Sequence, residues 1–471
     1  MHTEARQFLT NAAVGAANAA QRAAVKKAVA GYEATRERRK ARYQDWEHAR
    51  DAAAAVRREA IEHLDEHLPR LIAQLESRGA QVFVAADAAR ARQYIVDLAR
   101  RKSARSVIKS KTMTSEEIDL NAALHAAGVE PIESDLGEFI VQLRGEKPFH
   151  FVSPILNLTR AQVSQTFHEK LGVRQTDDVQ ELTMTARRFL RAKYCTADIG
   201  VTGANFAVAQ TGTISITENE GNARLTSSLP KVHVVLVGIE KIIPRLQDLA
   251  LFLPMLATSG AGQGLTCYNS LISGPRQRGE SDGPEEMHVV LLDNGRTNLL
   301  ADVEQRQSLH CIRCGACLNA CPVFRTIGGH AYGTTYQGPI GSVITPHFLG
   351  LARYQHLSQA SSLCGACTSV CPVKIDLHHH LLRNRRNAVR QVRPRAEGLA
   401  VRAYCAVARR PWMYRLLGRI LRVLAPGMET APGMPSMMSA WFRHRAMPVI
   451  PAETFRARWS RRGKEADRAG R

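Results

Sequence analysis

Seven of the ten cysteines in this chain lie in two short runs whose spacing can bind a metal centre. The first run ends before a proline and consists of Cys311, Cys314, Cys317 and Cys321. The second ends in the same way and consists of Cys364, Cys367 and Cys371. The first run has the C-x2-C-x2-C-x3-C-P spacing, whose thiolates can converge on a cubane iron-sulfur cluster. The second run is the same motif without its first cysteine.

The two runs together predict two clusters that share ligands. In bacterial two-cluster ferredoxins the last cysteine of each run binds the cluster of the other run. We therefore assign cluster 1 to Cys311, Cys314, Cys317 and Cys371, and cluster 2 to Cys321, Cys364 and Cys367. The fourth position of cluster 2 falls at Ser361, where the serine oxygen, water or another group completes a four-iron cluster, or the cluster has three irons. We expect two 4Fe-4S clusters, the second with three cysteine ligands.

Other uses of these cysteines fit the sequence less well. Pairs of the C-x2-C type also bind structural zinc, but four cysteines within eleven residues crowd a single zinc ion. A disulfide framework is disfavoured because no secretory signal precedes the cysteines and a chain of 471 residues needs no such staples. The three remaining cysteines are isolated in the sequence and are expected to be buried thiols: Cys195, Cys267 and Cys405.

Two cations and three histidines near the two runs could affect the clusters, either through their reduction potential or as further ligands. Arg313 and Lys374 are placed to raise the reduction potential by offsetting the negative charge of a cluster. Three consecutive histidines, His378, His379 and His380, are candidate ligands. We interpret them instead as solvated side chains of a helix that follows the second run.

Length and composition indicate that the cysteine runs belong to a larger protein. A chain of 471 residues with 45% apolar residues supports two or three domains with substantial cores. The predicted regions are N-terminal helices (1–70), an α/β domain (71–298), an α-helical ferredoxin-type two-cluster module (299–385) and a helical C-terminal region (386–471). The first region is rich in Ala and Arg and nearly free of Gly and Pro, which predicts two or three long helices.

The α/β domain is predicted from short apolar segments that alternate with helical patterns. These segments are residues 81–85, 106–109, 198–201, 213–217, 232–238 and 288–292. Such alternation is typical of a three-layer domain with a largely parallel sheet. Open sheets of this kind bind ligands at the carboxyl ends of their strands.

Two loops at predicted strand ends have the residue types of a ligand site. In the first loop, hydroxyl groups can cap a helix while Lys109 and Lys111 face a phosphate or carboxylate. The alternative is a capped turn with exposed lysines. In the second loop, Glu218 or Glu220 is a candidate catalytic carboxylate, with turn formation as the alternative. No G-x-G-x-x-G opens a helix after a strand, so a bound nicotinamide or flavin is not supported.

Most of the excess positive charge lies in the C-terminal region. The formal charge of the chain is +21, and residues 383–471 contain 21 Lys or Arg against 5 Asp or Glu. Residues 412–424 are predicted to form an amphipathic helix with Arg415, Arg419 and Arg422 on one face. Such a helix can lie on an anionic membrane, dock a partner or pack on its own domain. No nucleic-acid-binding motif accompanies it, so no nucleic acid is expected.

No export signal or membrane-spanning segment is predicted. The first residues lack the apolar core of a signal peptide. The longest apolar run, residues 249–257, has nine residues with a proline inside, against about 18 for a membrane span. We expect a cytoplasmic protein, with the basic helix as a means of peripheral association at the inner face of the membrane.

Several segments resemble a known family. Five of them resemble the lactate utilization (LUD) domain: residues 202–207, 210–214, 218–226, 229–234 and 238–242. Further segments, together with the first cysteine run, make nearly the whole chain similar to the lactate utilization protein B family: residues 327–332, 338–341 and 361–367. The incomplete second cysteine motif also resembles the family's own.

The resemblance implies a fold and a function. The α/β domain would share the fold of ribose-phosphate isomerases and CoA transferases. The chain would be the iron-sulfur electron-transfer subunit, without catalytic residues of its own, of a multi-component system that oxidises L-lactate to pyruvate and allows growth on lactate. The implied partners are the other subunits and a quinone or membrane-side electron acceptor. Two alternatives stay open, an α/β-domain enzyme acting on a small organic acid or phosphorylated metabolite, and a redox sensor whose basic tail binds nucleic acid.

Overall fold

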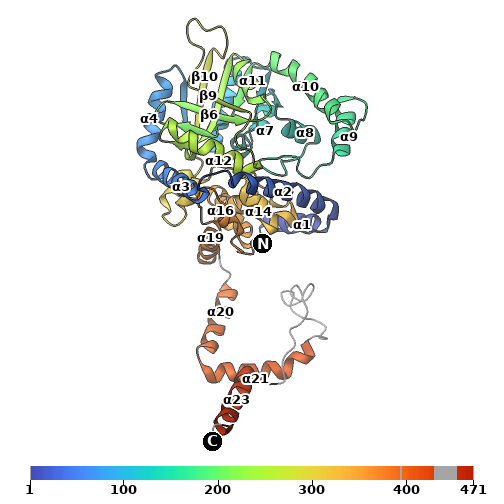
Figure 1. The fold of residues 1–471 in the computed structure, drawn as a ribbon, viewed down its shortest axis with the longest axis vertical. Helices are drawn as coiled ribbons and strands as arrows, with labels where there is room; N and C mark the ends of the chain where they lie inside the picture. Colours follow the sequence, from blue (N-terminus) through green and yellow to red (C-terminus); the bar gives the residue numbers. More distant parts are fainter. Residues whose placement is uncertain (1, 393–394, 429–452, 470–471) are drawn as a thin grey trace. The chain divides into compact units, whose positions relative to one another are not determined.

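The computed structural model describes residues 2–392, 395–428 and 453–469, and the chain divides into two compact units. The first unit comprises residues 1–391 and the second residues 392–471. The first unit contains the sheets and both cysteine runs, whereas the described part of the second is helical (Figure 1).

Four helices open the first unit, so the prediction of two or three long helices was wrong. They are α1 (Thr3–Ala17), α2 (Ala19–Lys40), α3 (Trp46–Glu62) and α4 (Leu64–Glu76). Two of the three breaks need neither Gly nor Pro, because a short polar side chain caps the next helix. Asn18 accepts a hydrogen bond from the backbone N–H of Gln21 (3.0 Å), and Asp45 accepts one from that of His48 (2.9 Å).

A six-stranded sheet with the order β1-β10-β7-β4-β2-β3 forms the centre of the α/β part, and all its neighbouring strands are parallel. Its strands are β1 (Gln81–Ala85), β2 (Ser106–Lys109), β3 (Glu130–Glu133), β4 (Ile199–Thr202), β7 (Val232–Gly238) and β10 (Glu286–Leu292). Five of the predicted segments are confirmed as strands of this sheet, two of them with shifted ends. The sequence pattern missed β3, a short strand that contains Pro131.

A second sheet has four strands in the order β8-β5-β6-β9. These are β5 (Phe206–Val208), β6 (Thr213–Glu218), β8 (Ile242–Ile243) and β9 (Tyr268–Ile272). The segment 213–217 was assigned to the largely parallel sheet, and the structure corrects this, because β6 pairs antiparallel with β5 and β9. Gly212, with φ +63°, lies in the short connection that turns the chain directly back, whereas parallel neighbours need a long crossover.

The parallel sheet is covered on both faces (Figure 1). Val234 and Leu236 of β7 pack with α5 (Ala88–Arg101) and α7 (Leu120–Ala126) on one face. Val235 and Val237 point to the other face, where they pack with α4 and the second sheet. All seven residues of β7 are buried, as expected for a parallel strand between two covering layers. The mixed α/β architecture with a parallel sheet is therefore confirmed.

The remaining elements of the first unit are helical. Beside the sheets lie α6 (Met113–Glu117), α8 (Leu136–Arg144), α9 (Arg160–Leu171), α10 (Val179–Thr196), α11 (Asn222–Ser228), η1 (Ile239–Lys241), η2 (Leu246–Asp248), α12 (Leu249–Ala261) and α13 (Arg296–Ala301). Around the cysteines lie η3 (Arg306–His310), α14 (Ala316–Ala320), α15 (Pro322–Ile327), η4 (His330–Tyr332), α16 (Gly338–Leu349), α17 (Leu351–Gln359), α18 (Ala366–Ser369) and α19 (Leu377–Val392).

The N-terminal helices pack against the cysteine-bearing region. Helix α2 contacts α12 beside the sheets and also contacts α14 and α15, so it lies between the two parts of the unit (Figure 1). The ring of Phe8 in α1 meets that of Tyr332 edge-on, with centroids 6.0 Å apart. A Cβ at Gly15 would collide with the carbonyl of Ile327, so this glycine allows α1 and α15 to approach closely. One hydrophobic core therefore joins the N-terminal helices to the cysteine runs.

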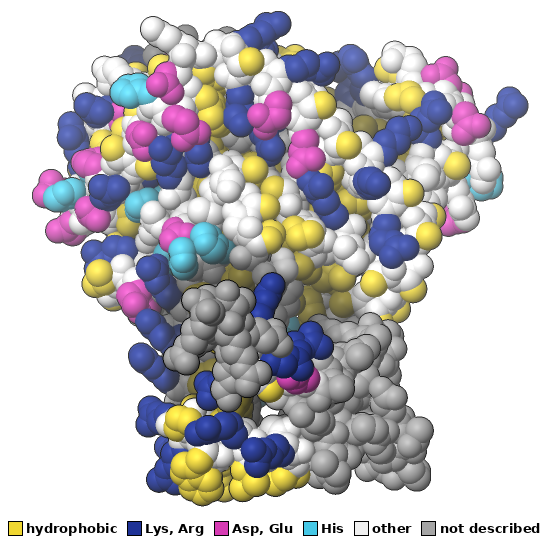
Figure 2. Space-filling model, turned by 60° about the horizontal axis from the view of Figure 1, so that its bottom comes forward, with side chains coloured by type: hydrophobic (Ala, Val, Ile, Leu, Met, Phe, Trp, Pro, Cys, Tyr) yellow, Lys and Arg dark blue, Asp and Glu magenta, His cyan; other side chains and the backbone are white. Residues whose placement is uncertain are grey.

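The second unit contains α20 (Arg395–Ala408), α21 (Pro411–Met428) and α23 (Phe455–Ala469). The predicted helix at 412–424 is confirmed within α21, although side chains from residue 421 onward, including Arg422, lie outside the described residues. Trp412, Leu416 and Ile420 are exposed. On the face drawn in Figure 2, Lys and Arg side chains are spread widely rather than gathered into one patch. Among the described residues, no helix is long and apolar enough to span a bilayer.

Candidate functional site

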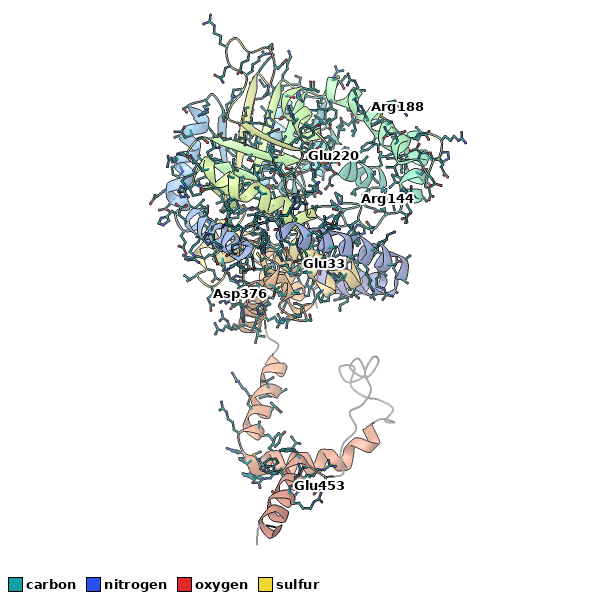
Figure 3. The ribbon with its side chains drawn as sticks, viewed as in Figure 1. Glu33, Arg144, Arg188, Glu220, Asp376 and Glu453 are labelled. Atoms are coloured by element: carbon teal, nitrogen blue, oxygen red, sulfur yellow. The ribbon has the colours of Figure 1, made fainter. Side chains whose placement is uncertain are left out.

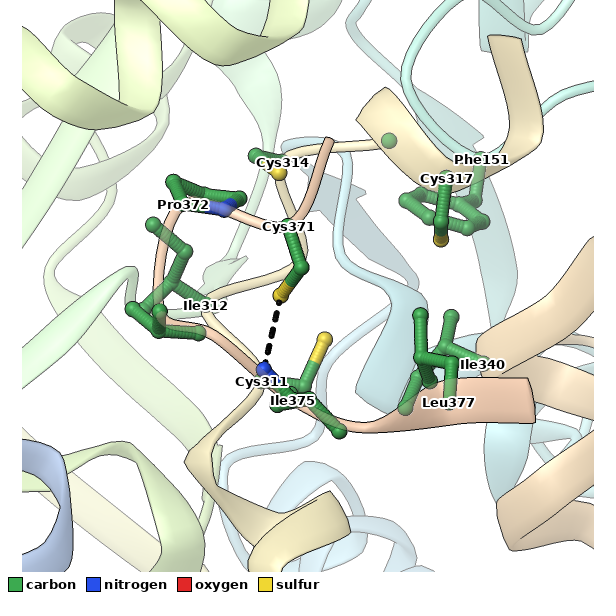
Figure 4. A pocket seen from close by; sticks show the side chains of 12 residues that line it. Phe151, Cys311, Ile312, Cys314, Cys317, Ile340, Cys371, Pro372, Ile375 and Leu377 are labelled. Atoms are coloured by element: carbon green, nitrogen blue, oxygen red, sulfur yellow. Dashed lines mark hydrogen bonds between the residues drawn. The ribbon is translucent and has the colours of Figure 1, made fainter. Parts of the chain in front are cut away.

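The structure brings the four predicted ligands of cluster 1 around one pocket. Their side chains line it from the two cysteine runs: Cys311, Cys314, Cys317 and Cys371. In Figure 4 the sulfur atoms face a common space, and Phe151, Ile340 and other apolar side chains form the remaining wall. Gly315 adopts φ +83°, a conformation that glycine takes without the strain of a side chain. Cys371 thus lies with the first run, as the shared-ligand arrangement predicts.

Backbone N–H groups and burial set the electrostatics of these thiols. The N–H of Ile375 donates to Sγ of Cys371 (3.3 Å), and that of Arg313 donates to Sγ of Cys311 (3.4 Å). Burial raises the pKa of Cys371 to about 12 and raises that of Cys314 further. Buried thiolates therefore need a strong positive charge at their centre, which iron supplies. Four convergent sulfurs, N–H donors to sulfur and an apolar wall fit an iron-sulfur cluster.

The three predicted ligands of cluster 2 also lie together, nearer the surface. Burial raises the pKa of Cys367 to about 11, and the neighbouring charge of Cys321 acts in the same direction. Cys364 is exposed, and hydrogen bonds from the backbone of Ala366 and the side chain of Ser362 lower its pKa. The thiols of the two sets influence each other, because the charge of Cys367 also raises the pKa of the buried Cys317.

The serine at the expected fourth position of cluster 2 forms a local turn. The hydroxyl of Ser361 accepts a hydrogen bond from the backbone N–H of Leu363 (3.1 Å). The guanidinium of Arg385 donates to the carbonyl of the same serine. Iron ligation by this hydroxyl would compete with the turn, and the fourth ligand stays a prediction.

Helix α3 supports both cysteine runs from outside. The side chain of Arg57 is buried and donates to the carbonyls of Leu309 and His310, which precede the first run, and to that of Ile242. Two turns earlier, Arg50 donates to the carbonyl of Cys371 (2.8 Å). Two arginines of one helix thus hold the backbone of both loops in place.

A buried network of charges connects the sheets to the first run. Glu240 pairs with Arg296 and with Nη2 of Arg313 (3.3 Å). Although burial acts in the opposite direction, these arginines lower the pKa of Glu240 to about 2. The Arg313 guanidinium lies 4.4 Å from the ring centroid of Tyr336, whose hydroxyl donates to Glu117 (2.6 Å). Next to this network, burial and then the charge of Arg313 lower the pKa of Lys241 to about 7.

The two cations proposed to tune the clusters differ in their surroundings. Arg313 is nine-tenths buried and takes φ +60°, an uncommon conformation for a residue with a side chain. Lys374 lies at the surface, where its ammonium pairs with Asp51 and with Glu47 (3.4 Å). Water screens such an exposed pair, so Arg313 is the stronger candidate.

The structure separates the two lysines of the first predicted loop. Lys109 is buried, and its Nζ lies 2.7 Å from Glu133 and 2.6 Å from Asn121, so the prediction that it faces a ligand was wrong. Lys109 and Glu133 are register partners on β2 and β3, which places their side chains on the same face of the sheet. Lys111 lines a cavity at the strand ends. Thr112 caps α6 as predicted, accepting from the N–H of Thr114 (3.3 Å).

The two glutamates of the second loop accept backbone hydrogen bonds at the starts of two helices and also line that cavity. Glu218 accepts from the backbone N–H groups of Ala223 (2.6 Å) and Arg224 (2.8 Å) at the start of α11, which confirms turn formation. Glu220 accepts from the N–H of Leu136 (3.0 Å). Burial, together with the charge of Asp135, raises the pKa of Glu220 to about 7. Figure 3 shows Glu220 beside the sheets.

The three histidines lie on a helix as predicted, but they are not all solvated. His379 is exposed and His378 is half-buried, whereas His380 is fully buried with Nδ1 2.8 Å from the Gln305 side chain. Burial lowers the pKa of His380 to about 4. The helical period explains the difference, because His380 shares the face of α19 on which Leu377 and Leu381 are buried.

The isolated cysteines contradict the prediction of buried thiols. All three are exposed: Cys195, Cys267 and Cys405. Cys195 lies in the last turn of α10 and Cys267 in the segment before β9, positions that no layer covers. Isolation in the sequence carries no information about burial.

Sequence analysis missed three residues that shape the site: Arg57, Lys241 and Tyr336. Lys241 lies within a segment used for the family resemblance and Tyr336 lies beside one, but no local pattern assigned them a role. Arg57 is one of many arginines on the N-terminal helices, and nothing in its neighbours distinguishes it. Only its contacts, with carbonyls about 185 to 253 residues away, reveal its function.

Three family models match segments of the chain between residues 68 and 464. Residues 68–292 match the LUD domain, residues 307–375 the 4Fe-4S dicluster domain and residues 378–464 the C-terminal part of lactate utilisation protein B. Lactate utilization protein B of Shouchella clausii is 42% identical over 89% of this chain and 90% of its own. The protein of that name from Geobacillus sp. is 43% identical over 88% of each chain, and that from Bacillus velezensis 44% over 79% of each.

Proposed function

The chain belongs to the lactate utilization protein B family, and we propose that it is the iron-sulfur electron-transfer subunit of a multi-component system that oxidises L-lactate to pyruvate. Family membership and the 4Fe-4S dicluster domain support a role in lactate utilization with iron-sulfur electron transfer. The observation that carries the proposal is the pair of neighbouring thiol sets, one with three buried members and none exposed, and one with an exposed member.

The arrangement of the two sets suits a relay. Oxidation of lactate to pyruvate releases two electrons and two protons, and each cluster, when bound, carries one electron. The proposed cluster 1 ligands are the half-buried Cys311 and the buried Cys314, Cys317 and Cys371. Those of cluster 2 are Cys321, Cys364 and Cys367. Cys364 is exposed, which supports the proposal that another protein approaches the clusters on the cluster 2 side. The partners are the other subunits of the system and, beyond them, a quinone or membrane-side acceptor.

The residues of this chain contribute positioning and electrostatics. Arg50 and Arg57 hold the loops that present the cysteines. The N–H groups of Arg313 and Ile375 donate to cluster 1 thiols and stabilise negative charge on sulfur. The buried Arg313 guanidinium adds a fixed positive charge beside the same thiols, which favours electron uptake.

Anaerobic electron paramagnetic resonance of the chain purified with its native partners tests the proposal. The spectrum is recorded before and after addition of L-lactate, without dithionite. We expect reduced-cluster signals only when both lactate and the partners are present. A Cys364→Ala variant should lose the cluster 2 signal, whereas Cys405→Ser, at an exposed cysteine outside both sets, should keep both. Clusters that dithionite reduces but lactate with partners does not would overturn the lactate assignment.

A further inference from the structure

A cavity of about 350 Å³ lies between the sheets and the first cysteine run. On the sheet side, it is lined by the loops that follow β2, β4 and β6, which contribute Lys111, Asn205 and Glu220. Its other wall includes Arg313, Cys314 and Tyr336. The carboxyl ends of parallel strands are the usual ligand site of such sheets, and the volume suits a small molecule. Neither the electron relay nor the family name requires this cavity.

Two cationic side chains in the cavity wall have unused hydrogen-bonding capacity. Within the described residues, Nη1 of Arg313 is buried and has no hydrogen-bond partner, although Nη2 is paired with Glu240. Lys241 is only 8% exposed, and its ammonium makes no hydrogen bond to any described residue. A buried donor without an acceptor, such as Nη1 of Arg313, is costly, so an anion that accepts from this atom and pairs with the Lys241 ammonium would stabilise this wall.

Acidic side chains in the cavity wall restrict the ligand to one negative group. Asp135, Glu218 and Glu220 line the same cavity. They repel a second anionic group but can accept hydrogen bonds from a hydroxyl. Asn205 and Thr112 add uncharged polar groups to the lining. The combination of cationic and acidic groups therefore favours an organic monoanion with an uncharged polar part over a polyphosphate.

We propose that this cavity binds a small organic monocarboxylate, held by Lys241 and Arg313 beside the site of cluster 1. Cys314 and Phe151 line both this cavity and the pocket of the four cluster 1 thiols, so one layer of side chains separates the ligand from the cluster site. A negative charge at this position disfavours electron uptake and lowers the reduction potential of cluster 1. The chain would thus have a small-molecule ligand of its own, and binding of that ligand in the cavity would change the reduction potential of cluster 1.

Calorimetric titration of the full, iron-replete chain tests binding under anaerobic conditions. The probes are L-lactate, pyruvate and inorganic phosphate. We expect saturable binding of at least one of the two carboxylates, at least tenfold tighter than that of phosphate. The Lys241→Met variant should bind that carboxylate at least tenfold more weakly. Lys231→Met, at an exposed lysine, should bind like the wild type.

A redox titration of cluster 1, followed by electron paramagnetic resonance, provides the second readout. The midpoint potential should fall when the bound carboxylate is present, and this shift should be lost in Lys241→Met with iron content unchanged. Absence of saturable carboxylate binding to the wild type would overturn the proposal even if Lys241→Met failed to fold. Equal affinity for phosphate, or full affinity in iron-replete Lys241→Met, would also overturn it.

The outcomes separate this site from the proposed electron relay. If lactate failed to reduce the clusters in the complex, the electron-relay proposal would be contradicted. Carboxylate binding to the isolated chain would not be affected by that result. If the isolated chain bound no carboxylate, the proposed cavity site would be contradicted. Lactate could then still reduce the clusters through the partners.

Discussion

Nε of Arg57 donates a hydrogen bond of 3.1 Å to the carbonyl oxygen of His310, the residue that immediately precedes Cys311. The same guanidinium reaches the carbonyls of Glu240 and Ile242 in the sheet region. A single side chain of helix α3 thus fixes the start of the first cysteine run relative to the sheets. Its position within the molecule makes it a structural requirement for the cluster 1 site.

Replacement of Arg57 by methionine should destabilise the fold and the cluster site together. The change leaves buried carbonyls without donors, and we expect the free energy of unfolding to fall by about 3 kcal/mol. Denaturant unfolding and the iron content per chain measure the two effects. Arg58→Met is the matched control, because the neighbouring Arg58 is exposed and should change stability by less than about 0.5 kcal/mol. Equal losses in both variants would contradict the role of Arg57.

Ligand sharing between the runs predicts which cysteine variants resemble each other. Cys371→Ala should give the same paramagnetic resonance spectrum and iron loss as Cys314→Ala, although Cys371 belongs to the second run. Cys321→Ala should instead match Cys364→Ala. The physical reason is the shared pocket of the first pair and the proximity of the second. If Cys371→Ala matched Cys364→Ala, each run would bind its own cluster.

Replacement by alanine should change the stability of the protein in opposite directions at two helical glycines. A Cβ at Gly341 would collide with the carbonyl of Tyr336, and overpacking of this kind costs about 1–3 kcal/mol. A Cβ at Gly31 would meet no atom within 4 Å, and alanine in an exposed helix stabilises by about 0.5–1 kcal/mol relative to glycine. The midpoint temperature of thermal unfolding should therefore fall for Gly341→Ala and rise for Gly31→Ala. A stabilising Gly341→Ala would show that the backbone can move aside.

A buried histidine should contribute to the loss of stability in acid. Burial lowers the pKa of His233 to about 3, against about 6.5 in an unfolded chain. Between these values only the unfolded chain binds the proton, so stability falls as the pH decreases below about 6.5. The loss from this residue between pH 7 and pH 5 is about 2 kcal/mol.

Unfolding of His233→Gln at both pH values measures this contribution. The decrease in stability between pH 7 and pH 5 should be smaller in the variant by the amount due to His233. His125→Gln, at an exposed histidine, should keep the wild-type pH dependence. An unchanged pH dependence in His233→Gln would mean that the imidazole is protonated in the folded protein.

The sequence predicted features that depend on local patterns. The apolar run of β7 identified a strand covered on both faces, and the cysteine spacing identified two thiol sets, because both signals lie within a few residues. The burial of Lys109 could not be predicted, since its partner Glu133 lies 24 residues away on another strand. The cavity was equally hidden, because its wall combines the loop after β4 with Arg313, which are distant in sequence.

The N-terminal helices that enclose the cysteine runs carry a consequence for the order of synthesis. Phe8, Val25 and Val29 belong to the same core as Cys314 and Cys371, yet more than half of the chain must be translated between them. Until the second run leaves the ribosome, these helices can pack only on segments translated earlier, such as α12, and part of their native surface is missing. Contacts of such long sequence separation form late, so metal loading can be completed only on a nearly full-length chain.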